Sequence, residues 1–276
     1  MARSLEKEWE RLQKREKNTI EKIESKTANQ NFSKLAELKQ GILEKIPEKL
    51  IIILNEGFQK AFKLIFSKGI NVIEKTYKKD ELVLDFVVND FRVNQRPDSM
   101  SLKQLDRQVR RRQRVNACAT VAEGIGLGAI GVGLPDIPLF LGILLKGIYE
   151  TSIGYGYNYN EEKEKILILK MIVAALSEPE EKKAANRDVD IWLDQMEDGT
   201  TSNINIEEEI QKASNALSQA LLLSKFLQGF FLVGMAGGIA NPIVYQKVVK
   251  YATQKYKKRY LNQKRISIKR KREAIL

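Results

Sequence analysis

Few residues in this sequence could carry out catalytic chemistry. The chain has no histidine and a single cysteine, Cys118. Without histidine, the Ser-His-Asp and Cys-His nucleophile systems are excluded, and so is every histidine-ligated metal site. A single cysteine also excludes an internal disulfide framework and a cysteine-rich zinc site. Carboxylates are therefore the main candidates for acid–base chemistry.

Two acids, Glu123 and Asp136, stand in otherwise apolar sequence. A carboxyl group in apolar surroundings can have a shifted pKa and act as a general acid or base, so a hydrolase acting on a lipid is one hypothesis. The simpler interpretation of Asp136 is the N-cap of the helix that follows it. The other acids cluster at predicted helix starts, where they complement the helix dipole. We therefore expect a non-catalytic protein, with the lipid hydrolase as the alternative.

The glycines from Gly124 to Gly133 show the GxGxG spacing of a phosphate-binding loop. No Walker lysine follows them, however, and the residues before them read as a helix where such a loop needs a strand. Asp188, Asp190 and Asp194 lack the glycine and the closing glutamate of a calcium loop. The sequence therefore predicts no bound cofactor and no metal.

The positive charge is concentrated in two segments. The formal net charge is +12, and the residues from Lys247 to the end hold twelve Lys and Arg against one acid, a net of +11. The segment 103–114 adds six basic residues against one acid, whereas 178–209 holds eleven acids against three basic residues. The two basic segments predict an anionic partner.

We expect that partner to be anionic membrane lipid. The basic C-terminal segment lies beside apolar helices, and each Lys or Arg near an anionic membrane surface contributes ~1 kcal/mol. Nucleic acid is less favoured because no recognised nucleic-acid module accompanies the basic residues. A merely solubilising tail is a further alternative. The residues expected at this surface are Arg110, Arg111, Arg112, Arg114, Lys255, Lys257, Lys258, Arg259, Lys269, Arg270, Lys271 and Arg272.

Two apolar, glycine-rich segments cover residues 121–149 and 226–245. The second runs for twenty residues without a formal charge, which is about the length that crosses a bilayer. Pairs such as Gly124/Gly128 and Gly234/Gly238 allow close helix packing. Interrupting glycines and prolines, and the charges of Asp136 and Lys146, weigh against insertion. We expect the central helices of a soluble or peripheral protein, with membrane-spanning hairpins as the alternative.

If these two segments face each other, they either close up or leave an apolar groove that holds a lipid acyl chain. Tyr149, Tyr155, Tyr157 and Tyr159 would then mark the polar end of the groove, or they are ordinary packing residues. The residues expected to line the groove are Gly124, Gly128, Gly131, Leu134, Asp136, Leu139, Phe140, Ile143, Tyr155, Phe230, Phe231, Gly234, Gly238 and Asn241.

Helical spacing of apolar residues predicts the elements that position these side chains. We expect a charged helix over 3–39, a helix that begins at Pro47, and helices over 137–153, 180–198 and 243–260. Residues 80–91 fit a strand or a helix, and we interpret them as a helix because the chain has no second clear strand. Asp98 or Ser101 should cap the basic helix that follows. The prediction is an all-α, single multi-helix globular domain with the glycine-rich apolar helices at its centre.

The run GxxGxGLPDIP at 128–138, followed by LxxxxxxIxxTSIGYGY, resembles the EcsC protein family, as does IANPIVYQKVVKYATQKYKKRYL at 239–261. The resemblance implies a helical fold and no defined activity. Its namesake is encoded beside an ABC transporter of Gram-positive bacteria, which suggests a membrane transporter as a partner. The family pattern falls on Gly128, Gly131, Gly133, Asp136, Pro138, Tyr155, Gly156, Gly234, Gly237 and Asn241.

We expect three parts: a charged N-terminal helix over 1–40, an EcsC-like helical domain over 41–261 and a basic tail over 262–276. The first residues contain no apolar stretch of the kind a signal peptide needs. Together with the single thiol, this predicts a cytoplasmic location. The resemblance implies a bacterial protein, and the basic segments lead us to expect it at the inner face of the cell membrane.

Overall fold

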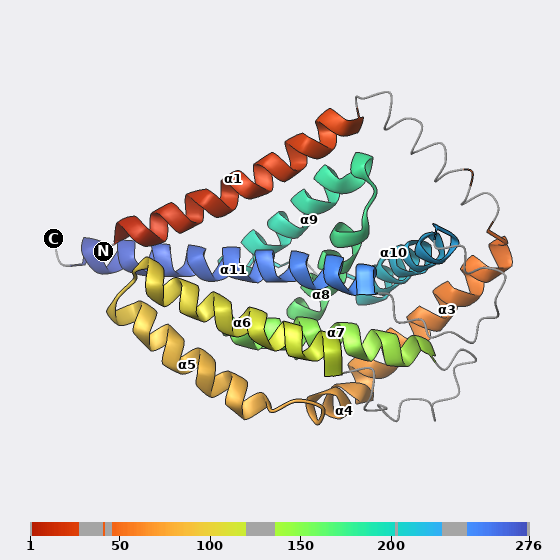
Figure 1. The fold of residues 1–276 in the computed structure, drawn as a ribbon, viewed down its shortest axis with the longest axis horizontal. Helices are drawn as coiled ribbons and strands as arrows, with labels where there is room; N and C mark the ends of the chain where they lie inside the picture. Colours follow the sequence, from red (N-terminus) through yellow and green to blue (C-terminus); the bar gives the residue numbers. More distant parts are fainter. Residues whose placement is uncertain are drawn as a thin grey trace.

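The described part of the chain is folded into helices, as the helical spacing of its apolar residues predicts. The computed structural model describes residues 2–27, 41, 46–119, 136–201, 204–227 and 242–274, and within them it has helices and no strand. The helices are α1 (Ala2–Thr27), α3 (Glu48–Leu64), η1 (Ile65–Gly69), α4 (Ile70–Glu74), α5 (Lys79–Gln95), α6 (Ser99–Ala119), α7 (Asp136–Gly154), α8 (Glu162–Leu176), α9 (Pro179–Asp198), α10 (Ile206–Leu227) and α11 (Pro242–Glu273) (Figure 1). The all-α prediction is confirmed, including the helix over 80–91.

Local signals in the sequence set several helix ends. The Asp98 side chain accepts hydrogen bonds from the backbone N–H groups of Met100 and Ser101, at 3.0 and 2.8 Å, so Asp98 caps α6 as predicted. Pro179 begins α9, where its missing N–H is no loss, and Gly199 ends that helix with a φ of +71°. These boundaries fix which residues face inward.

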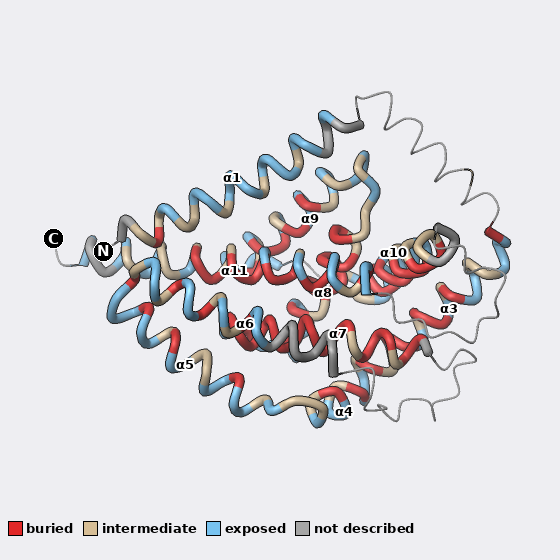
Figure 2. The backbone as a smooth tube through the Cα atoms, in the orientation of Figure 1, coloured by how far each residue is buried: buried red, intermediate tan, exposed pale blue. Residues whose placement is uncertain are grey.

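The hydrophobic core is continuous from α1 to α11, and α7 and α8 lie inside it. Helix α7 packs against α3, α5, α6 and α11, while α8 packs against α9, α10 and α11. Figure 2 shows both central helices mainly buried and α5 largely exposed along the outside. One core joins all these helices, so the described residues form a single domain.

Helix α7 is the one described helix that is long and apolar enough to cross a membrane, over Ile137–Gly154. The interior of the protein buries 89% of that window, as is typical of the core helix of a soluble protein. Its single lysine, Lys146, is buried and donates a hydrogen bond of 3.0 Å to the carbonyl of Thr76. The glycine-rich residues 120–135 and 228–241 lie outside the described residues.

Helix α11 continues well past the end expected near Tyr260. Residues 262–273 of the predicted basic tail are therefore helical, and the expected helix end was wrong. The Arg265 guanidinium explains the difference, because it pairs with both carboxylate oxygens of Glu6 on α1, at 2.7 Å each, and lies over the ring of Trp9. Helix α1 thus supports α11 along its C-terminal turns. The remainder of the helix expected over 3–39 lies outside the described residues.

Helices α7 and α11 approach closely at Gly147. A Cβ atom added there would lie 2.6 Å from the hydroxyl of Tyr245 and 3.0 Å from Val249, both on α11. Glycine therefore sets the spacing between the central helix and the basic helix. The glycines for which close packing was predicted, at 124–133 and 234–238, lie outside the described residues.

Candidate membrane interface and the charges of α11

The basic residues in the middle of α11 point into the protein, where they meet acids from distant segments. Lys255 is only 2% exposed, and its ammonium group contacts Glu16 of α1 and lies 2.7 Å from Asp190 of α9. Lys258, one turn further, contacts the same two carboxylates. Three helices are thus joined by a four-membered charge cluster.

Lys257 makes a second junction on the other side of α11. Its ammonium group lies 2.7 Å from Glu8 of α1 and contacts Asp106 of α6. Asp106 also accepts a 3.0 Å hydrogen bond from the hydroxyl of Tyr155, which follows α7. Burial raises the pKa of Tyr155 well above its ordinary value, so this hydroxyl remains a donor.

Arg259 is largely buried against α8, where its partner Glu164 is fully buried. It pairs with Glu164, and its guanidinium lies 4.0 Å from the centre of the Tyr157 ring. The hydroxyl of Tyr256 donates a further hydrogen bond of 3.2 Å to Glu164. Buried charges are tolerated only when they are paired in this way.

These contacts correct part of the predicted basic, anion-binding surface. Lys255, Lys257, Lys258 and Arg259 use their charges inside the protein and cannot together form an exposed basic patch. The sequence could not reveal this, because the compensating acids lie on α1, α6, α8 and α9. The acidic stretch 178–209 was a partial sign of internal pairing, since it contains Asp190, which pairs with Lys255 and Lys258.

The other predicted basic residues divide into two groups. Arg110 and Arg111 on α6, and Lys269 and Arg270 near the end of α11, are exposed. The side chains of Arg112, Arg114, Lys271 and Arg272 lie outside the described residues. Basic residues that remain accessible are therefore found on α6 and at the end of α11.

An exposed apolar stripe runs along α5, and sequence reasoning missed it. Leu84, Val87, Val88 and Phe91 are spaced i, i+3, i+4 and i+7, so they share the helix face opposite the buried core residues. Leu84 is 63% exposed and Phe91 61%. The sequence carried a signal, because residues 80–91 hold apolar side chains at more helical positions than the one face that packs on the core can cover.

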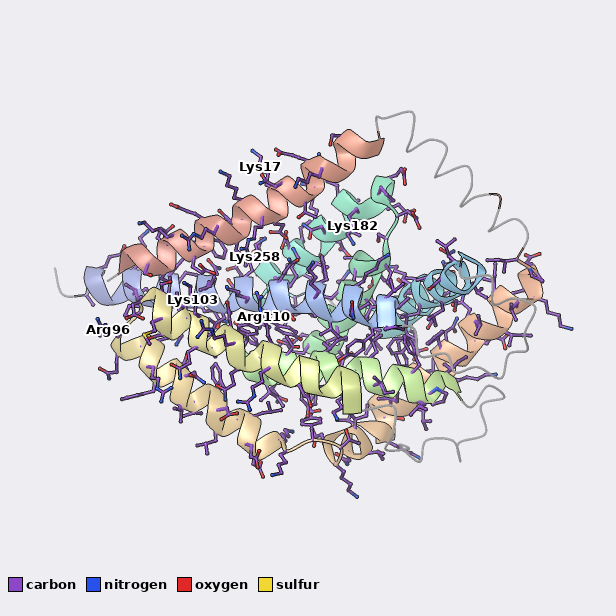
Figure 3. All side chains as sticks on the ribbon, in the orientation of Figure 1. Lys17, Arg96, Lys103, Arg110, Lys182 and Lys258 are labelled. Atoms are coloured by element: carbon purple, nitrogen blue, oxygen red, sulfur yellow. The ribbon has the colours of Figure 1, made fainter. Side chains whose placement is uncertain are left out.

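Helix α6 lies beside α5 and exposes basic residues. Lys103, Arg107 and Arg111 are exposed, and their spacing places them on the outward face of α6. In Figure 3, Lys103 lies on this helix and Arg96 at the turn that joins it to α5. The acids Asp80 and Glu81 lie at the opposite end of α5, where Glu81 pairs with Lys78 at 2.7 Å. We call this combined surface the α5–α6 face.

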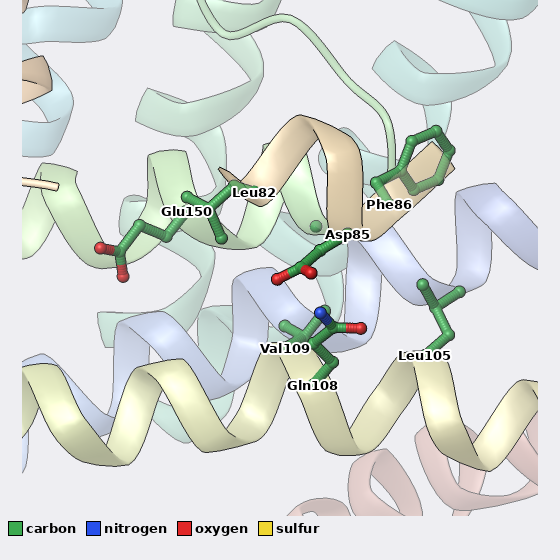
Figure 4. Close-up of a pocket in the computed structure, with 8 residues that line it drawn as sticks. Leu82, Asp85, Phe86, Leu105, Gln108, Val109 and Glu150 are labelled. Atoms are coloured by element: carbon green, nitrogen blue, oxygen red, sulfur yellow. The ribbon is translucent and has the colours of Figure 1, made fainter. Parts of the chain in front are cut away.

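The seam between α5, α6 and α7 contains a small cleft lined by Phe86, Gln108 and Glu150 (Figure 4). Its volume is about 10 Å³. This is near the minimum for one water molecule, so the cleft is too small for an acyl chain or a substrate.

Most of the predicted apolar groove cannot be placed. The undescribed residues include Gly124, Gly128, Gly131, Leu134, Phe230, Phe231, Gly234, Gly238 and Asn241. Glu123 and the side chains of Cys118 and Asp136 also lie outside the described part of the chain. On α7, Leu139 and Ile143 are half-buried, and Phe140 is buried with its ring edge-on to Phe58. The groove stays a prediction.

The four tyrosines expected either at a polar groove end or in ordinary packing are all buried. Tyr149 stacks on Tyr159 with ring centres 4.0 Å apart, and Tyr157 stacks on Tyr256 at 5.6 Å. The packing interpretation is therefore correct for this cluster.

The model of the EcsC protein family matches residues 6–261. The chain belongs to the EcsC protein family. It is 26% identical to Protein EcsC of Bacillus subtilis (strain 168) over 216 residues, which cover 77% of this chain and 78% of that protein. No solved structure matches the chain. The family match begins in α1 and ends in α11, so every residue of the charge clusters around Lys255, Lys257, Lys258 and Arg259 lies within it.

Three residues of the EcsC family pattern have structural roles that the structure describes. Pro138 is buried in the first turn of α7, where proline is tolerated. Tyr155 is the hydrogen-bond partner of Asp106. Gly156 adopts a φ of +87°, and a Cβ atom there would collide with the ring of Phe86. These residues shape the junction of α5, α6 and α7.

The cluster around Glu16 predicts a loss of stability in acid. Burial by itself raises the pKa of Glu16, but Lys255 and Lys258 outweigh it and lower this pKa from 4.5 to about 2. A carboxyl group whose pKa falls on folding contributes stability above its unfolded pKa, and that stability is lost as the pH falls. We expect a loss of ~3 kcal/mol between pH 4.5 and about 2.

The measurement is the free energy of unfolding by urea across this pH range, for the wild type and Glu16→Gln. The glutamine cannot titrate, so its stability should fall less steeply than that of the wild type. If the unfolding free energies of the two proteins fall in parallel with pH, Lys255 and Lys258 do not lower the pKa of Glu16.

Proposed function

We propose that this EcsC family protein is a non-catalytic, peripheral membrane protein that attaches to anionic lipid through the α5–α6 face. The observation that supports this is the exposed apolar stripe of α5 beside the basic surface of α6. A helix with an exposed apolar face next to basic residues is the usual arrangement for lying in the plane of a membrane interface. The cytoplasmic face of the cell membrane is the anionic surface available to a bacterial protein of this kind.

The two parts of the face contribute by different physical effects. Each Lys or Arg close to an anionic surface contributes ~1 kcal/mol, and this term is screened by salt. A large apolar side chain contributes about 1.5–3 kcal/mol when it is fully buried, so partial insertion of Leu84 and Phe91 adds a comparable, salt-resistant term. The sum corresponds to reversible attachment.

The alternative partners predict different requirements. Nucleic acid would need the basic residues of α6 but not the apolar stripe of α5, because phosphate contacts carry non-specific binding. A membrane transporter could use the same stripe, but it would not need anionic lipid. A lipid hydrolase would depend on Asp136 or Glu123, whose side chains lie outside the described residues.

The test is co-sedimentation with vesicles of phosphatidylcholine, with and without phosphatidylglycerol. We expect binding only with the anionic lipid. Arg107→Gln/Arg111→Gln should weaken binding roughly 30-fold, because two charges at ~1 kcal/mol each are removed. Leu84→Ser/Phe91→Ser should weaken it at least about tenfold and reduce the fraction that stays bound in high salt.

Ile191→Ser on α9 is the matched control for the apolar variant, because Ile191 is an exposed apolar residue outside the α5–α6 face. It should bind like the wild type, and melting temperatures should show that all variants fold. Equal binding to neutral vesicles, or wild-type binding by both double variants, would contradict the proposal. Binding to RNA or DNA without binding to vesicles would favour the nucleic-acid alternative.

A further inference from the structure

A cavity of about 100 Å³ lies between α1, α6, α9 and α11, away from the apolar stripe of α5. It is about ten times the volume of the cleft beside Phe86, so it has room for several water molecules or a small ion. Its walls carry six basic side chains and a single acid, Glu16. In Figure 3, Arg110, Lys182 and Lys258 come toward this region from three different helices.

The charges around the cavity do not balance. Lys255, Lys257 and Lys258 share four carboxylates, those of Glu8, Glu16, Asp106 and Asp190. The remaining three basic wall residues, Arg15, Arg110 and Lys182, form no ion pair with any residue that the structure describes. Six cations against four carboxylates leave an excess of two positive charges.

Two of the cations lie near the same aromatic ring, and Lys182 also donates a hydrogen bond to the carbonyl of Ala174. The ammonium groups of Lys182 and Lys255 lie 5.4 and 5.6 Å from the centre of the Tyr251 ring. Burial lowers the pKa of Lys182 to about 8, and the charges of Lys247 and Lys255 act in the same direction, against Glu178. An anion in the cavity that both lysines line would reduce the repulsion among these like charges.

We propose that this cavity binds a phosphate group, either as a free small anion or as the headgroup of a phosphomonoester lipid. A phosphate monoester carries a charge of about −1.5 to −2 at neutral pH, which matches the positive excess of the cavity. Arginine and lysine are the side chains that bind phosphate, and Arg15 and Arg110 have their guanidinium groups available. The site shares no residue with the apolar stripe, so it stands independently of membrane attachment through the α5–α6 face.

The binding experiment uses calorimetry on the full chain with three probes: inorganic phosphate, glycerol 3-phosphate and dihexanoyl phosphatidic acid. Sodium chloride at matched ionic strength is the reference. Arg110→Gln and Lys182→Met remove cavity charges without breaking the ion pairs of α11. Each should weaken phosphate binding at least about tenfold, because a charge-assisted hydrogen bond is lost.

The controls are lysines on the same helices that do not line the cavity. Lys17→Gln removes a charge on the outer side of α1, where Lys17 is exposed, and Lys183→Met does so next to Lys182 on α9. Both should bind the probes like the wild type. Arg110 is exposed, so Arg110→Gln keeps the experiment informative even if Lys182→Met is unstable.

The outcomes distinguish a free phosphate from a lipid headgroup, or they show that the cavity binds neither. Binding of all three probes supports a general phosphate site, whereas binding of phosphatidic acid alone supports a lipid headgroup. Binding no stronger than that of chloride, or equal binding by the wild type and Arg110→Gln, would overturn the proposal. Neither result depends on vesicle binding, and Leu84→Ser/Phe91→Ser should bind the soluble probes normally.

Discussion

Arg259→Ala is expected to lower the free energy of unfolding by about 3–5 kcal/mol, the usual effect of removing one partner from a buried ion pair. Burial raises the pKa of Glu164 even with Arg259 beside it, so the variant would leave a carboxyl group buried without a counter-ion. The stacking of the guanidinium on Tyr157 would also be lost. The measurement is urea unfolding at neutral pH, followed by circular dichroism.

The matched control replaces both partners. Arg259→Leu/Glu164→Leu should be more stable than either single leucine variant, because no buried charge is left unpaired and the space is filled. The coupling free energy from this double-mutant cycle measures the pair itself. If the loss of unfolding free energy in the double variant equals the sum of the losses in the two single variants, the two side chains do not act as a pair.

Gly156→Ala is expected to destabilise the protein by about 2–5 kcal/mol, for two separate reasons. The φ of +87° is a left-handed conformation that costs an L-residue about 1–2 kcal/mol. The added methyl group also meets the ring of Phe86, and overpacking of a core costs about 1–3 kcal/mol. Thermal unfolding of the variant, compared with the wild type, checks the sum.

Gly199→Ala separates the two effects. Gly199 also has a positive φ, +71°, but nothing lies within 4 Å of the position that a Cβ atom would occupy. This variant should therefore show the conformational cost alone, about 1–2 kcal/mol. In the background of Phe86→Ala, the cost of Gly156→Ala should fall toward the same value. Equal effects at both glycines in the wild-type background would argue against the clash.

The buried pairs also bear on how the protein would meet its partners. Acids on α1, α6, α8 and α9 pair with the basic residues in the middle of α11. This part of α11 therefore holds those four helices together inside the protein. Among the predicted basic residues that the structure describes, those left for external anions lie on α6 and near the end of α11, and the cavity adds Arg15 and Lys182. The basic residues proposed to bind lipid at the α5–α6 face, and Arg15, Arg110 and Lys182 at the cavity, are not used in these internal ion pairs.

Much of the fold could be read from the sequence, because helices depend on local patterns. Apolar spacing placed α3, α7, α9 and most of α11, and Asp98 marked the start of α6. The two basic segments and the EcsC family pattern could also be read directly. The extension of α11 to Glu273 could not, because it depends on the contact of Arg265 with Glu6 and Trp9 on another helix.

The sequence by itself determined the helical class, the family and the number of positive charges. Only the tertiary structure decided which of those charges face water, because Lys255 and Lys257 find their acids some 240 residues away along the chain, on α1. Exposure of the α5 stripe was likewise decided by packing, since the core covers Leu82 and Val93 and leaves Leu84 and Phe91 outside. Local periodicity specifies a helix, but which of its faces is covered depends on neighbours brought together from the whole chain.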